Sequence, residues 1–199
     1  MRRTKCDLEA GLVRCLHMSV SSTGRDRELL EASLDRVTLE LASVVGLEVE
    51  CAELVVSREG ERPSVGEGVH VSFRIGLLAA GAQRHGALVL GLEPALAAAG
   101  QLLGRPEKEQ VAAIRAGELD AEWKEGLLEV ASVFGAAIDV ALRDGVGVDV
   151  HACSEGCQGV KSGAAPILDH EEGRDLLVGR FQWCPEGMAA SEGYLAVDL

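Results

Sequence analysis

The sequence predicts an α+β fold: a pseudo-twofold unit in which two long helices pack on a largely antiparallel sheet. Stretches 25–45 and 119–145 place apolar residues at steps of three and four, which is typical of amphipathic helices. The order of helix, strand, hairpin, short helices, long helix and three strands favours helices on one face of an antiparallel sheet. An octet is also nearly repeated, because LELASVVG at 39–46 and LEVASVFG at 128–135 agree at six of eight positions, 89 residues apart.

Length and charge limit the classes of function. The 199 residues suffice for one sizeable domain, which we place at 25–199 after an N-terminal extension at 1–24. The net charge of −13 opposes binding to nucleic acid, whose phosphates attract clustered Lys and Arg, and suits protein partners. No apolar stretch reaches the roughly 20 residues that span a bilayer, so we expect a cytoplasmic protein with no membrane contact. The six dispersed cysteines are expected to be free thiols.

Local patterns place the individual elements. A clean alternation of apolar and polar residues at 69–78, followed by the buried run 87–92, predicts a hairpin. Asp120 can cap the long helix, and Gly145 can stop it. The other expected elements are a strand at 47–57, a short helix at 93–104, a helical connection at 105–118, and strands at 146–153, 175–183 and 193–199.

A stripe of polar residues follows one side of each long helix. Glu129 and Ser132 stand one turn apart within the second octet, and side chains at this spacing are neighbours on a helix. Glu40 and Ser43 repeat the arrangement in the first octet. Such a stripe is either the solvated side of an amphipathic helix or a site that acts on one group of a partner. Its members are Glu122, Glu125, Glu129, Ser132 and Asp139 on the long helix, and Ser33, Arg36, Glu40 and Ser43 on the first helix.

Two stretches carry the pattern of a known family, namely GALVLGLEPALAAAGQLLG at 86–104 and LDAEWKEGLLEVASVFGAAIDVAL at 119–142. In the CheC/CheX/FliY family of bacterial chemotaxis proteins, three features occur in this order. They are a strand of the form Gly-x-Leu-x-Leu, a helix ending in Leu-Leu-Gly, and a long helix with Glu-x-x-Asn and then Gly. From about residue 28 to 199 the chain resembles this family, and CheX in particular. The resemblance implies a pseudo-twofold α+β unit with two long helices on a sheet.

The resemblance also implies an activity. Members of the family dephosphorylate the response regulator CheY: the acid of Glu-x-x-Asn holds a lysine of the receiver domain, and the Asn orients the attacking water. Glu129 matches the acid, and Ser132 stands at the position of the Asn. Glu40 and Ser43 correspond in the same way in the first helix. We therefore expect the chain to bind a phosphorylated receiver domain and to be at most a weak phosphatase.

Further expectations concern the partner and the cofactor. Any Mg²⁺ in such a complex would belong to the response regulator, so no cofactor of this chain is expected. The residues expected to contact the receiver domain around the candidate catalytic residues are Glu122, Glu125 and Arg36.

Two other functions stay open. The chain could be a non-catalytic assembly module of the chemotaxis or flagellar switch apparatus, with the strand at 193–199 as a free sheet edge for a homodimer. Alternatively, His151, Cys153 and Cys157 could form a metal or thiol sensor, because such soft ligands hold zinc. The usual Cys-x-x-Cys spacing is absent there, so no metal site is assigned.

Overall fold

The computed structural model describes residues 23–79, 81–116, 119–145, 149–171 and 173–199. The helices are α1 (Gly24–Glu40), α2 (Leu92–Leu102), α3 (Glu107–Ala116) and α4 (Ala121–Val140). The π-helical segments η1 (Leu41–Val45) and η2 (Ala141–Gly145) extend α1 and α4. The strands are β1 (Val49–Glu59), β2 (His70–Ala79), β3 (Ala82–Gly91), β4 (Val150–Val160), β5 (Leu176–Pro185) and β6 (Ser191–Val197).

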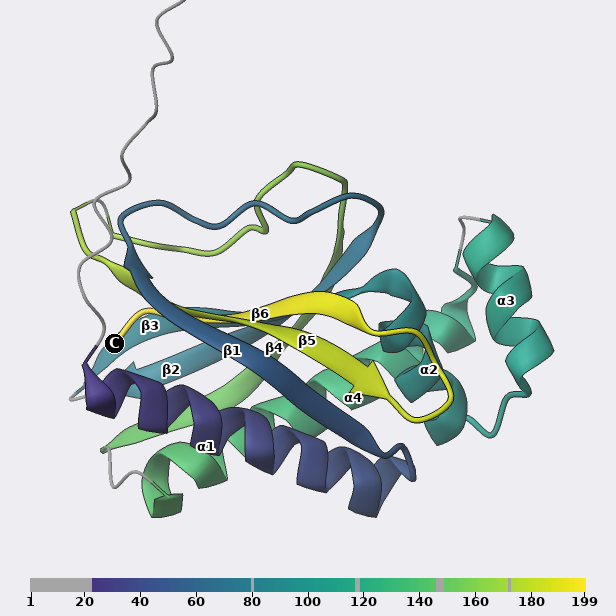
Figure 1. The fold of residues 1–199 in the computed structure, drawn as a ribbon, viewed down its shortest axis with the longest axis horizontal. Coiled ribbons are helices and arrows are strands. Elements are labelled where there is room, and N and C mark those ends of the chain that lie inside the picture. Colours follow the sequence, from purple (N-terminus) through teal and green to yellow (C-terminus); the bar gives the residue numbers. More distant parts are fainter. Residues whose placement is uncertain (1–22, 80, 117–118, 146–148, 172) are drawn as a thin grey trace, which may run out of the picture.

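The six strands form one sheet in the order β1-β5-β6-β3-β2-β4, and all neighbours are antiparallel. The long helices α1 and α4 cover one face of the sheet, and two connecting segments lie over the other face (Figure 1). This arrangement confirms the expected α+β fold with two long helices on an antiparallel sheet.

The sheet interleaves two similar halves of the chain. Each half runs from a long helix through a long strand to a pair of strands, as α1–β1–β2–β3 and as α4–β4–β5–β6. The long strand of each half pairs with the other half, β1 with β5 and β4 with β2, while β3 and β6 meet in the middle. Both long strands carry a bulge, at Glu53–Leu54 and at Glu155–Gly156. The halves are therefore related by a pseudo-twofold axis.

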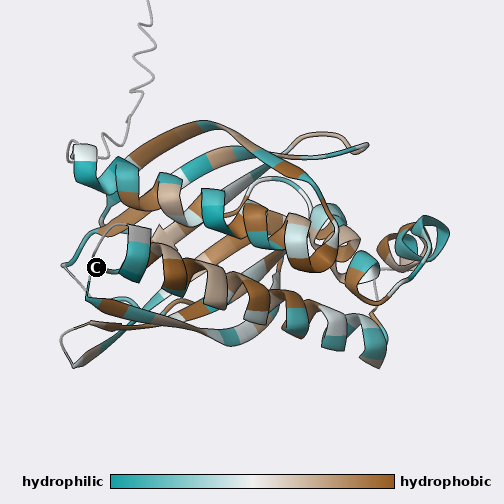
Figure 2. Ribbon diagram, turned by 90° about the horizontal axis from the view of Figure 1, so that it is seen from below, coloured by the Kyte–Doolittle hydropathy of each residue, from teal (hydrophilic) through white to brown (hydrophobic). Residues whose placement is uncertain are grey.

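Both long helices begin at a capping residue. Thr23 and Asp26 form a capping box at the start of α1, and Asp120 accepts a hydrogen bond from the Trp123 N–H at the start of α4. The two helices lie side by side (Figure 2), and the sequence colours of Figure 1 show that they run in opposite directions. The C-terminal end of α1 consequently lies beside the N-terminal half of α4.

The main core lies between these helices and the sheet. The Phe73 ring of β2 meets the Phe134 ring of α4 edge to face, with 4.8 Å between the ring centroids. The Phe134 ring also contacts the Trp183 ring of β5, at 6.5 Å. At Gly135 the helix α4 approaches β4 so closely that a Cβ atom would lie 2.5 Å from the backbone nitrogen of Ser154. These contacts fix which side of α4 faces the sheet.

A smaller apolar cluster lies on the other face of the sheet. Segments 60–69 and 161–171 cover strand residues that point away from the helices, among them Val89 and Tyr194. The Tyr194 hydroxyl donates a hydrogen bond to the Pro63 carbonyl at 3.0 Å, and burial raises the pKa of this phenol. Both faces of the sheet are therefore covered by protein over part of their area.

Two sequence-based expectations about the fold are wrong. The C-terminal strand β6 has β5 and β3 on its two sides, so it offers no free edge, and the edge strands are β1 and β4. The two octets do not occupy equivalent positions either. The first octet ends the helix at Gly46, which has φ 74°, whereas the second lies inside α4, which continues beyond Gly135.

The positions of the helix caps explain why the octets differ. Asp120 comes 97 positions after Thr23, whereas the octets are 89 positions apart. The similarity of the octets is therefore not a consequence of the pseudo-symmetry. Counted from the caps, the α1 residues that match Glu129 and Ser132 are Ala32 and Asp35.

The expected N-terminal extension at 1–24 lies almost wholly outside the described residues, which begin at Thr23. The helix α1 begins at Gly24. The expected strand at 146–153 starts among residues that are not described, and β4 begins at Val150. None of the described helices combines the length and the apolar character needed to cross a membrane.

Candidate functional site

The side of α4 that faces away from the sheet carries the main residues expected to contact a partner. Glu125, Glu129 and Ser132 are exposed there, because the apolar residues between them turn toward the core. Leu128 lies among them with 48 % of its surface exposed. Within the described parts of the chain, neither Glu125 nor Glu129 has a hydrogen-bond or ion-pair partner. Both carboxylates are therefore available to a cationic group of another molecule.

The Ser132 hydroxyl is oriented by its own helix. It donates a hydrogen bond to the Leu128 carbonyl oxygen, at 3.1 Å. Its own oxygen keeps lone pairs that can accept a hydrogen bond from water or from a partner. Glu129 and Ser132 thus present a carboxylate and a hydroxyl one turn apart, an arrangement that can bind a cation and hold a water molecule.

At the N-terminal end of α4, Glu122 already has an internal partner. It forms an ion pair with Arg105, whose guanidinium also lies 3.5 Å from Asp120 and 4.9 Å from the centre of the Trp123 ring. The hydrogen bond to Glu122 raises the pKa of Arg105, and the Trp123 N–H bond lowers the pKa of Asp120. A partner that used Glu122 would have to compete with Arg105.

At the other end of the stripe, Asp139 has a structural role. Its carboxylate accepts a hydrogen bond from the Ala152 N–H of β4 at 2.8 Å, and it pairs with Arg143 at 2.8 Å. Only 19 % of this side chain is exposed. Asp139 therefore ties the edge strand β4 to α4 and does not belong to the exposed group around Glu129.

The candidate residues of the first helix have different surroundings. Glu40 is partly buried and forms an ion pair with Arg36, one turn earlier in the same helix. The exposed Ser43 hydroxyl donates a hydrogen bond to the Glu40 carbonyl oxygen at 3.3 Å. Glu40 and Ser43 are thus neighbours, as the spacing predicts, but the Glu40 charge is balanced within the helix and the Glu129 charge is not. The exposed apolar side chains Leu39 and Val44 flank the pair.

The structure separates the three candidate metal ligands. Cys157 packs against the main core, and burial raises the pKa of its thiol, whereas Cys153 and His151 are exposed on β4. The bulge at Glu155–Gly156 turns Cys153 and Cys157 toward opposite faces of the sheet. In the ranges that the structure describes, no group of three or more His, Cys, Asp or Glu residues is arranged to hold a metal ion. Cys51, Cys153, Cys157 and Cys184 are free thiols.

An apolar groove beside α4 was not expected from the sequence. It has a volume of about 420 Å³ and lies where α4 meets the starts of β2 and α2 and the end of β4. Leu127, Leu128 and Val69 line it, and Lys124 stands at its border. The groove is formed by residues that lie far apart in the sequence, so no local sequence pattern predicts it.

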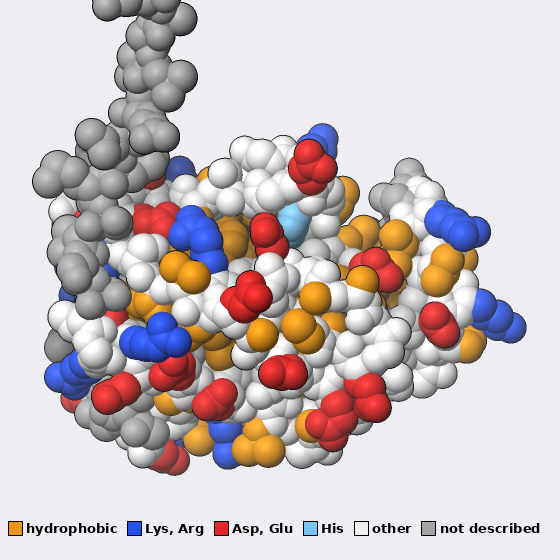
Figure 3. Space-filling model, in the orientation of Figure 1, with side chains coloured by type: hydrophobic (Ala, Val, Ile, Leu, Met, Phe, Trp, Pro, Cys, Tyr) orange, Lys and Arg blue, Asp and Glu red, His pale blue; other side chains and the backbone are white. Residues whose placement is uncertain are grey.

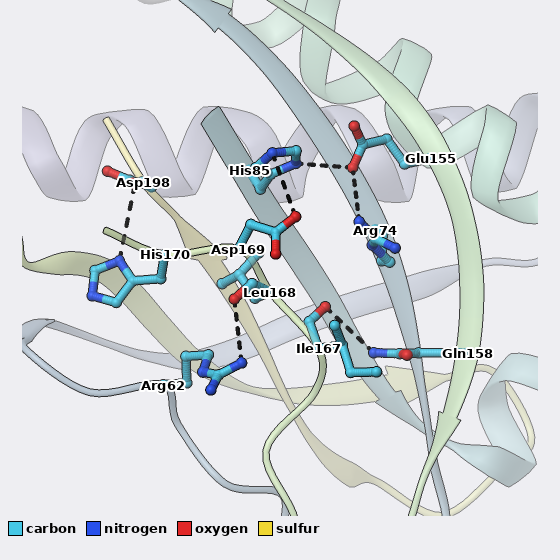
Figure 4. A network of polar contacts seen from close by, with 10 residues as sticks. All are labelled: Arg62, Arg74, His85, Glu155, Gln158, Ile167, Leu168, Asp169, His170 and Asp198. Carbon is cyan, nitrogen blue, oxygen red and sulfur yellow. Dashed lines mark hydrogen bonds and ion pairs between the residues drawn. The ribbon is translucent and has the colours of Figure 1, made fainter. Parts of the chain in front are cut away.

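A polar network on the face of the sheet opposite the long helices was also not expected from the sequence (Figure 4). The Nδ1 atom of His85 on β3 lies 3.0 Å from the Glu155 carboxylate, which also accepts a hydrogen bond from Arg74 at 3.4 Å. The His85 Nε2 atom lies 3.9 Å from Asp169, and His170 lies at the same distance from Asp198. The network joins segment 161–171 to the strands. The alternation of apolar and polar residues in β2 predicts that Arg74 lies on this face, but it does not predict which residues Arg74 contacts.

Comparisons with known proteins support the fold. No protein-family model matches the sequence, and a search of curated proteins finds no match. Solved structures do match. FliY from Thermotoga maritima has a TM-score of 0.65 at 14 % identity, over 90 % of this chain and 92 % of FliY. CheX from Vibrio vulnificus has a TM-score of 0.55 at 16 % identity, over 85 % of this chain and 97 % of CheX.

A flagellar protein matches as well. The structure of a FliG–FliM complex from H. pylori matches with a TM-score of 0.60 at 12 % identity, over 89 % of this chain and 94 % of the matched chain. At these identities the similarity establishes architecture and not activity. The chain has the fold of the CheC/CheX/FliY chemotaxis proteins.

Proposed function

We propose that this protein acts in chemotaxis signalling or in the flagellar switch, and that the outer side of α4 binds a CheY-like receiver domain. One observation carries the proposal: on a fold shared with FliY and CheX, Glu129 and Ser132 are exposed one turn apart, and Glu129 has no partner among the described residues. An unpaired surface carboxylate can meet a lysine of a partner without first losing an internal ion pair.

The apolar groove and the exposed Leu128 support the same side of α4 as an interface. Protein interfaces combine an apolar centre with a polar rim, and Leu128 lies between Glu125 and Glu129. The carboxylates of Glu125 and Glu129 on either side of Leu128 suit a partner surface that carries Lys or Arg, whereas the groove itself is bordered by Lys124. Glu125 adds a second carboxylate, which disfavours close approach of a phosphoryl group to this end of the stripe.

We infer that phosphatase activity is weak. The catalytic role proposed for the Ser132 position is to orient a water molecule, and a hydroxyl is shorter than an amide and offers one donor where the amide offers two. The Ser132 donor is also engaged by the Leu128 carbonyl. A displacement of the attacking water by about 1 Å can lower a rate about a hundredfold.

Titration of the full chain with a receiver domain tests the binding proposal. The receiver, from the same cell, is titrated with and without an acyl-phosphate mimic. Binding is expected to strengthen with the mimic, and Glu129→Ala is expected to weaken it about tenfold. Glu28→Ala is the matched control, because Glu28 is an exposed carboxylate on α1. Absence of binding in both states, or an equal effect of both variants, would refute the proposal.

The decay of a phosphorylated receiver tests the enzymatic part. Wild type is expected to accelerate decay slightly, and Ser132→Asn is expected to accelerate it further because the amide restores a second donor. Wild-type decay equal to spontaneous decay eliminates catalysis. Equal acceleration by wild type and Glu129→Ala eliminates the proposed site.

The similarity to a chain of the FliG–FliM complex favours a second candidate function, a non-catalytic module of the flagellar switch. The protein would then bind a FliG-like partner and leave receiver phosphorylation unchanged. Titration with a FliG-like protein from the same cell separates the candidates, because only the switch module is expected to bind it.

A further inference from the structure

A cleft lies at one end of the sheet, on the face opposite the long helices. It consists of two adjoining cavities of about 230 and 610 Å³, which share Gly66, His70 and Glu192. The first cavity lies over β1, β5 and β6, beside segment 60–69, and the second lies between that segment and the start of α2. The second cavity shares Val69, His70 and Leu92 with the apolar groove beside α4, but no residue of α4 lines either cavity of the cleft.

The charge around the cleft is acidic. Glu53 borders the first cavity, Glu67 and Glu93 border the second, and Glu192 borders both. Among the described residues that line the two cavities, Arg180 is the one Lys or Arg. Its guanidinium is already bound by both carboxylate oxygens of Glu59.

Two polar groups inside the cleft lack partners. His70 is 9 % exposed, and its Nδ1 atom has no hydrogen-bond partner among the described residues. Its side chain points to this face because the alternate β2 residues, Val71 and Phe73, point into the main core. The Ser191 hydroxyl, which borders the second cavity, is likewise buried without a partner. A buried polar group without a partner is costly, and a ligand atom would satisfy it.

The walls between these polar groups are apolar. Val55, Val65 and Val89 line the first cavity, and Val69, Pro94 and Ile114 line the second. Val55 is 63 % exposed and Val69 is 50 % exposed, so uncovered apolar surface lies beside the carboxylates. Hydrophobic side chains also lie beside Asp and Glu side chains on the face of the molecule seen in Figure 3. This combination fits a positively charged head group on an aliphatic stem, because the stem covers apolar surface while the head meets the carboxylates.

We propose that this cleft binds an extended basic segment of a partner protein and takes up its Lys or Arg side chains. The carboxylates of Glu53 and Glu192 receive the cation, and the apolar walls receive the stem. The net charge of −13 favours the approach of such a segment over long distance. Binding here needs neither Glu129 nor Ser132, so it can succeed or fail independently of receiver binding.

The test is a nuclear magnetic resonance titration of the full chain with the peptide acetyl-Gly-Lys-Gly-Arg-Gly-amide. The matched neutral peptide carries norleucine and citrulline in place of Lys and Arg. The basic peptide is expected to shift the amide signals of Gly66 and Gly193 saturably, with a dissociation constant of about 1 mM or lower. The shifts are expected to weaken when salt is raised to about 0.5 M.

Variants locate the site. Glu192→Gln is expected to weaken binding about threefold to fivefold, which is the range for an exposed charge pair. Glu28→Gln on α1 is expected to leave binding unchanged, since Glu28 is also exposed but lies in the helical layer. Equal binding of the neutral peptide, equal weakening by both variants, or no saturable shift at about 10 mM peptide would overturn the proposal. Binding of free arginine as tight as that of the peptide would overturn the protein segment as occupant.

Discussion

Among single residues, Asp26 has one of the most completely satisfied charges in the structure. Its carboxylate accepts hydrogen bonds from Arg58 of β1 at 2.6 and 3.0 Å, and a third from the Thr23 N–H at 3.0 Å. The Arg58 bonds lower the pKa of Asp26 below its ordinary value of 3.8. The pair joins the start of α1 to β1, an edge strand whose one neighbour among the described strands is β5.

This pair predicts a dependence of stability on pH. Because the pKa of Asp26 is lower in the folded state than in the unfolded state, its contribution is complete above about pH 4–5 and is lost as the pH falls through the folded value. Asp26→Asn is expected to lower the free energy of unfolding in urea by about 1–3 kcal/mol at pH 7. The difference from wild type is expected to shrink below about pH 3, whereas an unchanged difference would contradict the assignment. Glu28→Gln serves as the control.

Gly135 predicts a packing effect. A Cβ atom there would lie 2.5 Å from the Ser154 nitrogen, which belongs to backbone and cannot turn aside as a side chain can. Gly135→Ala is expected to reduce the free energy of unfolding by about 1–3 kcal/mol, measured in urea. Gly159→Ala is the matched control in β4, since its Cβ would have no atom within 4 Å. Equal stability of the two variants would show that α4 and β4 separate at no cost.

The exposure of single side chains could be foreseen better than their contacts. The helical period predicts that Glu129 and Ser132 lie on the outer side of α4, and both side chains are exposed there. The same period places Asp139 in the same stripe. Its bond to the Ala152 N–H could not be foreseen, because it depends on how far the edge of the sheet reaches past the helix.

At the scale of elements, the tie between α4 and β4 can be measured. Asp139→Ala removes the acceptor of the Ala152 N–H and so breaks this hydrogen bond between the start of β4 and α4. Hydrogen exchange of the β4 amides is expected to accelerate about fivefold to tenfold, which corresponds to about 1–1.4 kcal/mol. Asp144→Ala, an exposed carboxylate of η2, is expected to leave exchange unchanged. Acceleration in both variants would point to general loosening of the helix end.

The type of each element could be predicted from local sequence patterns, whereas its neighbours in the sheet could not. The hairpin of β2 and β3, the Asp120 cap of α4 and the presence of three late strands agree with the sequence pattern. The position of β6 could not be inferred, because a strand that ends the chain can lie at an edge or inside a sheet with the same alternation. The expectation that the two octets are equivalent was wrong for a related reason. Eight residues specify which side of a helix is apolar, but not where along the helix the octet lies.

At the scale of the whole molecule, the interleaved sheet predicts one cooperative unfolding unit. Among the described strands, β1 pairs only with β5 and β4 pairs only with β2, so each half of the chain stabilises the long strand of the other. Urea transitions followed by far-UV circular dichroism and by tryptophan fluorescence are expected to coincide. Separate midpoints would show that one half unfolds first.

The single crossing between the halves has a practical consequence. The stretch from residue 103 to 120, which includes α3, is the one place where the chain passes from the first half to the second. Two separate polypeptides divided within this stretch would each lack partners for a long strand, and each would supply what the other lacks. Such fragments are suited to reconstitution on mixing, and a shortened bridge would favour exchange of halves between two copies.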